Sequence, residues 1–416
     1  MSARKAVIVF GGPRDRYQSA VALQENQALE ALVTEAYFSS FWAGTGLCGR
    51  HFHRFAKVRH HPDIPVGKVV RSPAAFARTL LARLDGRKDS GHYAAADRLL
   101  GALAARVALA RQAPLVAYSY YAADAFRRME GSGLPRILFQ VHPNGRFLRE
   151  LFRREIEQVP EAKASLLEET EMSPLFAHND DAFAQAEAVI CASDFTRHSL
   201  AAAGCRAPTH VVGYGVDLEL FAARSVAPSA GPLTVGFVGA LSQRKGARYL
   251  LAALAALPPG AARLVLYTRA KVDRALLRGF ESVDLEVRGG LSDAALAADL
   301  RRCDLVALPS IAEGFGLVIL EAMACGVPVL CTTSTGGADF IVHRRNGLLV
   351  APGSAAALEQ ELAWALTHRD ELFLMGRAAR LEAERHGWAE YRRKFFAAYA
   401  EAVGAPSITP VAPALR

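Results

Sequence analysis

The sequence lacks several features that would place it in a special class of protein. None of its apolar runs approaches the roughly 20 residues that a membrane-spanning helix needs. The six cysteines include no C-x-x-C pair, and most lie in apolar stretches, which is typical of buried thiols in a cytoplasmic protein. Only a short apolar run precedes Gly11-Gly12. This run indicates a first strand and not a signal peptide.

Acidic residues are scarce in the first part of the chain. Residues 1–154 contain 24 Lys and Arg against 11 Asp and Glu, whereas residues 155–416 contain 25 against 30. The basic part predicts an anionic partner, such as a phosphorylated acceptor or the inner face of a membrane. Nucleic acid is the weakest alternative, because no basic motif interleaved with aromatic residues is present.

The stretch His51–Pro62 is rich in histidine. It contains four histidines but no acidic residue and no cysteine. Its arginines would repel a metal ion, so we expect a basic loop near an anionic acceptor and no metal site.

The chain is long enough for two domains, since its 416 residues are 51% hydrophobic and 22% charged. Short apolar runs alternate with helical patterns throughout, which predicts two doubly wound α/β domains with parallel sheets. In the first half we expect strands at Ala6–Phe10, Leu115–Tyr118, Ile137–Val141 and Ala188–Ala192, and helices at Gln18–Leu32, Pro73–Arg111 (broken near Gly86–Gly91), Arg146–Glu157, Ala162–Ala186 and Ser193–Ala203.

The pattern restarts after a proline-bearing linker that ends near Pro232. Further strands are expected at Leu233–Val238, Leu264–Tyr267, Leu285–Val287, Leu305–Leu308, Val327–Cys331 and Leu348–Val350, and a final amphipathic helix at Trp388–Val403. We therefore predict a first domain at residues 1–210, a second domain at 211–388, a crossover helix at 389–404 that packs back on the first domain, and a mobile tail at 405–416.

The most informative stretch runs from Asp304 to Pro328 and is expected to form a strand, a loop, a helix and a stop. Gly314 and Gly316 in the loop allow a ligand to approach the backbone, and the first N–H groups of the helix suit a phosphate. Glu313 and Glu321 are spaced as E-x7-E and could accept hydrogen bonds from several sugar hydroxyls. Taken alone, both could equally be solvated acids at the start of a helix.

This stretch resembles the E-x7-E signature of the family 4 retaining glycosyltransferases, which have the GT-B fold. The resemblance implies that residues 1–210 bind the acceptor and residues 211–388 the nucleotide sugar. It also implies that Glu313 contacts the donor sugar and Glu321 the ribose. It further implies catalytic roles for Arg244 and Lys245, which would neutralise the leaving diphosphate, and for His142 at a strand end. The remaining residues that it assigns to donor binding are Gly12, Gly239, Gly289, Gly290, Gly314, Phe315, Gly316 and Leu317.

Two positions depart from the family pattern. Ala240 stands where many members have an arginine, so Arg244 would take over its work, and Asp339 stands where a glutamate is usual. The segment Thr335-Gly336-Gly337 would border the donor site.

The implied reaction moves a hexose from a nucleotide sugar, such as a UDP- or GDP-sugar, to an acceptor hydroxyl with retention of configuration. The acceptor would be a saccharide or a lipid-linked precursor of an envelope polysaccharide or exopolysaccharide. The sequence contains no D-x-D motif, which agrees with a reaction that needs no metal and no cofactor. Two alternatives stay open: a sugar-nucleotide epimerase of similar fold, and a non-catalytic module that binds nucleotide sugars.

Overall fold

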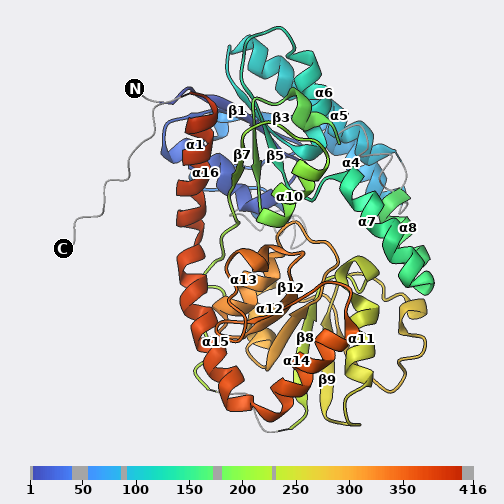
Figure 1. Ribbon diagram of the computed structural model, residues 1–416. Coiled ribbons are helices and arrows are strands. Elements are labelled where there is room, and N and C mark those ends of the chain that lie inside the picture. Colours follow the sequence, from blue (N-terminus) through green and yellow to red (C-terminus); the bar gives the residue numbers. More distant parts are fainter. Residues whose placement is uncertain (1–2, 40–54, 86–90, 172–179, 227–230, 405–416) are drawn as a thin grey trace, which may run out of the picture.

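The computed structural model describes residues 3–39, 55–85, 91–171, 180–226 and 231–404. It contains two parallel sheets, each flanked by helices, which are stacked one above the other in Figure 1. The prediction of two Rossmann-like domains is therefore confirmed. No helix in these ranges has the length and apolar character that crossing a membrane requires.

The first sheet has seven parallel strands in the order β3-β2-β1-β4-β5-β6-β7. The central strands are short and almost completely buried, because helices cover both faces of the sheet, whereas the edge strands β3 and β7 are partly exposed. The strands are β1 (Ala6–Val9), β2 (Leu29–Thr34), β3 (Val69–Arg71), β4 (Leu115–Tyr118), β5 (Arg136–Gln140), β6 (Ala188–Cys191) and β7 (Thr209–Val211). The helices around it are α1 (Gln18–Glu25), α4 (Pro73–Asp85), α5 (His92–Ala110), α6 (Ser119–Arg128), α7 (Gly145–Gln158), α8 (Lys163–Glu171) and α10 (Asp194–Ala202).

The second sheet has six parallel strands in the order β10-β9-β8-β11-β12-β13. Its strands are β8 (Leu233–Val238), β9 (Ala262–Tyr267), β10 (Asp284–Arg288), β11 (Leu305–Leu308), β12 (Val329–Thr332) and β13 (Leu348–Val350). The helices are α11 (Ala247–Ala255), α12 (Asp293–Leu300), α13 (Leu317–Ala324), α14 (Ala355–Thr367), α15 (Arg369–Ala383) and α16 (Trp388–Ala402).

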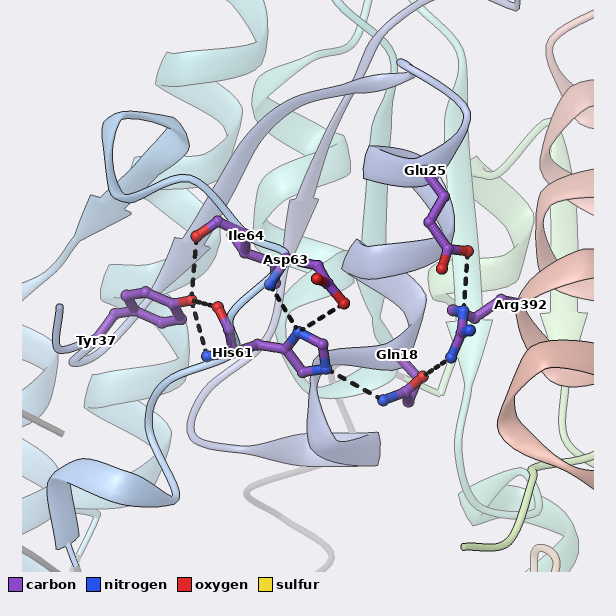
Figure 2. A network of polar contacts seen from close by, with 7 residues as sticks. All are labelled: Gln18, Glu25, Tyr37, His61, Asp63, Ile64 and Arg392. Atoms are coloured by element: carbon purple, nitrogen blue, oxygen red, sulfur yellow. Dashed lines mark hydrogen bonds and ion pairs between the residues drawn. The ribbon is translucent and has the colours of Figure 1, made fainter. Parts of the chain in front are cut away.

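The last helix, α16, leaves the second domain and packs beside α1 of the first, as the sequence predicts (Figure 1). Arg392 donates to Glu25 at 2.9 Å and to the side-chain oxygen of Gln18 at 2.6 Å. The amide nitrogen of Gln18 lies 3.4 Å from the ring of His61, whose own segment is held by the hydroxyl of Tyr37 (Figure 2). The crossover helix is thus tied through α1 to the loop that follows β2.

Two helix predictions are wrong. The helix expected at Gln18–Leu32 ends at Glu25, and the end of that stretch, from Leu29 onward, belongs to strand β2. The chain reverses at Gln27, which adopts a left-handed φ of 56° with no glycine or proline to mark it. Strands β3 and β7 were also not predicted.

The helix expected at Ala162–Ala186 is likewise interrupted: α8 ends at Glu171, and Ala182–Gln185 forms a 3₁₀ turn. The break expected near Gly86–Gly91 falls mostly on residues 86–90, which lie outside the described ranges; α4 is described to Asp85 and α5 from His92. His51, His53 and the tail at 405–416 also lie outside them.

Candidate active site between the two domains

The E-x7-E stretch lies where the carboxyl ends of the second sheet meet the first domain. Strand β11 ends at Leu308, a loop follows, and α13 begins at Leu317. Gly316 precedes the helix with a φ of 84°, and Gly326 follows it with a φ of 73°. Residues with a side chain rarely adopt such positive φ values. The predicted order of strand, glycine loop, helix and glycine stop is confirmed.

Glu313 is held between two cations from another loop. Its carboxylate accepts from Arg244 at 3.1 Å and lies 3.4 Å from the ammonium of Lys245. Burial alone would raise the pKa of Glu313. The charges of Arg244, Lys245 and His142 outweigh burial and lower this pKa to about 2, so the carboxylate is ionised at every physiological pH.

The loop after β8 that carries these cations is fixed from both domains. Gln243, which is fully buried, donates from its side-chain amide to Glu155 of α7 at 2.8 Å. Gly246 has a φ of 74°, and a Cβ there would lie 2.0 Å from the carbonyl oxygen of Pro309. The loop therefore needs glycine at this position to pack beside the Glu313 segment.

Gly239, at the end of β8, has no side chain, which leaves room for the side chain of Lys245. A Cβ at Gly239 would lie 3.0 Å from the Lys245 Nζ atom. The predicted donor residue Gly239 thus lies directly beside the predicted catalytic Lys245.

Gly314 brings His142 to the same site. A Cβ on Gly314 would lie 2.3 Å from the carbonyl oxygen of Val141 and 3.2 Å from the Cα of His142, at the end of β5. The Gly314 carbonyl also accepts from the hydroxyls of Ser193 and Thr196 in the first domain. The two domains are therefore in contact at the site, and the exposed His142 comes next to the Glu313 loop.

Glu321 lies on α13 in surroundings of the opposite kind. Burial, with a contribution from the charge of Asp293, raises its pKa to about 7, although Arg16 opposes the shift. Arg16 comes from the first domain and pairs with Asp293 at 2.9 Å and Asp217 at 3.3 Å. Leu317, at the start of the same helix, is 39% exposed, so its apolar side chain is open to a ligand.

A cavity of about 390 Å³ opens at the carboxyl ends of β8, β9 and β10. This size lies within the range of about 300–1,000 Å³ that is usual for small-molecule sites. Its walls include backbone and apolar groups from all three strand ends and the rim carboxylate of Asp293; the lining residues are Val238, Gly239, Ala240, Tyr267, Thr268, Arg269, Ala270, Arg288, Gly290, Leu291, Asp293 and Leu296.

Residues 232–368 match the family model described as "Glycosyl transferases group 1". The second domain is a group 1 glycosyltransferase domain. The match includes both cations of the Gln243–Lys245 loop, both glutamates and the 390 Å³ cavity.

Curated proteins similar to this chain include D-inositol 3-phosphate glycosyltransferases. That of Segniliparus rotundus is 32% identical over 48% of this chain and 49% of its own length. That of Saccharomonospora viridis is 30% identical over 53% of this chain and 57% of its own length. The chain therefore spans about half the length of the curated relatives that it matches.

Solved structures extend the likeness to both domains. Sucrose-phosphate synthase from Thermosynechococcus elongatus superposes with a TM-score of 0.66 at 17% identity, covering 94% of this chain and 96% of the synthase. Anabaena HepE in complex with UDP-glucose gives 0.60 at 19% identity, covering 96% and 99%. At these identities the likeness is one of fold, and that fold is GT-B.

Three of the residues predicted to bind the donor present no side chain to the cavity or to Glu313. The ring of Phe315 is only 4% exposed and packs between Tyr214 and Phe340, so only its backbone can face a ligand. Gly289 lies beside the cavity lining but is not part of it, in contrast to Gly290. Gly12 lies in the turn after β1 with a φ of 66°, on the side of the first domain.

Sequence reasoning missed the residues just after Gly12. Asp15, Arg16 and Tyr17 all adopt positive φ values, which is unusual for residues with a side chain. The carboxylate of Asp15 is buried and accepts from Tyr118 at 2.6 Å and Tyr391 at 3.3 Å. Burial raises the pKa of Asp15, although these hydrogen bonds oppose the shift. The charged run P-R-D-R-Y after the glycines was the available signal.

Asp339 serves the contact between domains. It accepts a hydrogen bond from the backbone N–H of Asp194 at 3.0 Å, and burial raises its pKa to about 6. Its neighbour Gly336 packs on Phe315, where a Cβ would lie 2.5 Å from the ring.

Proposed function

We propose that this protein transfers a sugar from a nucleoside-diphosphate sugar to an acceptor hydroxyl with retention of configuration at the anomeric carbon. The observation that carries the proposal is the position of Glu313. This ionised carboxylate lies between Arg244 and Lys245, against the first domain. The matched family and its curated relatives are glycosyltransferases, which agrees with this function.

The donor would lie along the second domain with each part facing a different group. The nucleobase would occupy the 390 Å³ cavity, whose rim leads to Asp293 and α13. Glu321 would accept from the ribose hydroxyls, and Leu317 would cover the apolar side of the donor. A UDP-sugar is our first candidate, because HepE binds UDP-glucose and UDP in the same fold.

The diphosphate would bind Arg244 and Lys245 together with the N–H groups at the start of α13. As the bond to the sugar breaks, negative charge grows on the leaving phosphate, and fixed cations lower the energy of that transition state. These two side chains would supply this stabilisation without a metal ion. The leaving phosphate would then accept the proton of the attacking hydroxyl.

Glu313 would bind hydroxyls of the donor sugar and hold it against His142. A pKa near 2 and two bound cations make its carboxylate a poor nucleophile. A double displacement through Glu313 is therefore disfavoured, and attack from the same face as the leaving group accounts better for retention.

The acceptor would approach from the first domain, past the turn that contains Gly12. The relatives are named for an inositol 3-phosphate acceptor, and the basic first domain suits an anionic one. We propose a phosphorylated or lipid-linked saccharide precursor, used in the cytoplasm at the inner face of the membrane in the synthesis of an envelope polysaccharide or exopolysaccharide.

A thermal-shift screen against nucleoside diphosphates and their sugars, with and without magnesium, tests the donor site. We expect one nucleoside diphosphate to stabilise the protein selectively, and a ligand at 100 times its Kd adds about 2.7 kcal/mol. The Glu321→Ala variant should lose this response while it remains folded. If no nucleotide raises the melting temperature, the proposed donor site is wrong.

A further inference from the structure

The outer face of α4 carries an unusual stripe of exposed leucines. Leu80, Leu81 and Leu84 are 47%, 46% and 75% exposed, whereas Ala75, Thr79 and Ala82 on the opposite face are buried. Residues three and four positions apart share a helix face, so Leu84 lies beside both Leu81 and Leu80, and the three form one stripe. Half of the large apolar side chains that are exposed in the described ranges lie between residues 58 and 99.

Arginines border this stripe on both sides. At 100° per residue, Arg78 and Arg83 fall on opposite flanks of the leucines, and both are exposed. Helix α4 contains one acidic residue, Asp85 at its last position, and the neighbouring α5 also contains one, Asp97. An apolar stripe between cations is the pattern of a surface that lies in the interface of an anionic bilayer.

A groove of about 750 Å³ lies between the start of α4 and the second half of α5. Its lining includes the apolar side chains of Leu103 and Leu109 and the basic side chains of Arg71, Arg106 and Arg128. Guanidinium groups bind phosphate through paired hydrogen bonds, so a groove lined by both arginines and apolar side chains suits a phospholipid headgroup and the start of its chains.

We propose that the outer surface of α4 and α5 docks on an anionic phospholipid bilayer. A second copy of this chain is a poorer occupant, because it would bring two arginine-bordered faces together. Arg71 ends strand β3, and the carboxyl ends of parallel strands share one edge, so the docking surface begins at the edge that carries Gly12 and His142. A docked protein would thus hold its cleft near a lipid-linked acceptor; this consequence, unlike the docking, rests on the proposed function.

Sedimentation with vesicles tests the docking surface in the full-length protein. We expect binding to vesicles of phosphatidylcholine with phosphatidylglycerol, and little binding to phosphatidylcholine alone. Changing Leu80, Leu81 and Leu84 to glutamine should weaken binding at least about 50-fold, because their exposed area no longer enters the bilayer. Changing Arg78 or Arg83 to glutamine should weaken it about fivefold each.

The matched control changes Leu374 and Leu381 to glutamine, since both are exposed leucines on α15 of the second domain. This control should bind vesicles as the wild type does. The proposal is overturned if the wild type ignores phosphatidylglycerol, if the α4 variants bind normally, or if the α4 face proves instead to join two copies in solution. Nucleotide-induced stabilisation of the same variants should be unchanged, which separates failure of docking from failure of the donor site.

Discussion

Glu321→Gln should stabilise the fold while it weakens nucleotide binding. The pKa of Glu321 is raised from its ordinary value of 4.5 to about 7. The folded state therefore binds more protons than the unfolded state between these two values. The stabilising contribution of this group is complete below pH 4.5 and is lost as the pH rises through 7. Above pH 7 the buried charge costs about 3 kcal/mol, which glutamine does not incur.

Urea unfolding at pH 5.5 and pH 8.5 measures this cost. Titration of Glu321 should remove about 2 kcal/mol of wild-type stability between the two pH values. The free energy of unfolding of Glu321→Gln should lack this loss, so its advantage over the wild type should grow by about 2 kcal/mol. The exposed Glu130→Gln variant is the control and should follow the wild type at both values.

Calorimetric titration with the nucleoside diphosphate found by thermal shift measures the predicted loss of nucleotide affinity. Hydrogen bonds to a charged acceptor are worth about 1.5–3 kcal/mol, so the affinity of Glu321→Gln should fall about 10- to 150-fold at pH 8. Wild-type affinity should rise from pH 6 to pH 8 as Glu321 ionises. A variant with wild-type affinity, or with no gain in stability at pH 8.5, would refute the reasoning.

Three further predictions concern Glu313, the domain contact at Gly314 and the independence of transfer from metal ions. Glu313→Gln should abolish transfer. The lowered pKa of Glu313 gives the wild type a stabilisation that is complete above pH 4.5 and is lost as the pH falls toward 2. In urea unfolding the variant should therefore be about 3 kcal/mol less stable than the wild type at pH 7 and little different at pH 2. Gly314→Ala should lower transfer at least tenfold and cost about 1–3 kcal/mol, because its Cβ meets the backbone of Val141, whereas Gly67→Ala, with open space around it, should behave as the wild type in both assays. EDTA should leave the rate of nucleoside diphosphate release unchanged; a loss of rate that added magnesium restores would contradict the role given to Arg244.

The sequence predicted the second domain well because its strands are legible. A parallel strand with helices on both faces is apolar at every position, as in Leu305–Leu308, and glycines mark its turns. The stretch Gln18–Leu32 has neither signal. Its strand β2 contains Leu, Glu and Ala, which favour helix, and the turn before it depends on a strained glutamine. Pairing with β1 makes the end of this stretch a strand, and the local sequence pattern contains no information about that pairing.

Spacing also predicted where the two glutamates lie but not how they differ. Seven residues separate Glu313 from Glu321, yet one has a pKa of about 2 and the other about 7. The difference comes from residues far along the chain, since Arg244 and Lys245 lower the pKa of Glu313, whereas Asp293 helps to raise the pKa of Glu321. These neighbours exist only after the loops of the second sheet assemble.

This asymmetry has a consequence for the donor. Arg244 and Lys245 are already paired with Glu313 before a diphosphate arrives, so the incoming phosphates must share or take over both cations. A bound diphosphate would loosen the hold on Glu313 and free its oxygens for the sugar hydroxyls. Binding of the diphosphate and of the sugar would then favour each other, and the complete nucleotide sugar should bind more tightly than its separate parts allow.

In Glu313→Gln no carboxylate at this position competes for Arg244 and Lys245, so the nucleoside diphosphate should bind at least about tenfold more tightly than in the wild type. Calorimetry on the nucleoside diphosphate alone measures this directly, and weaker binding by the variant would show that the carboxylate holds the cations in place and does not compete for them.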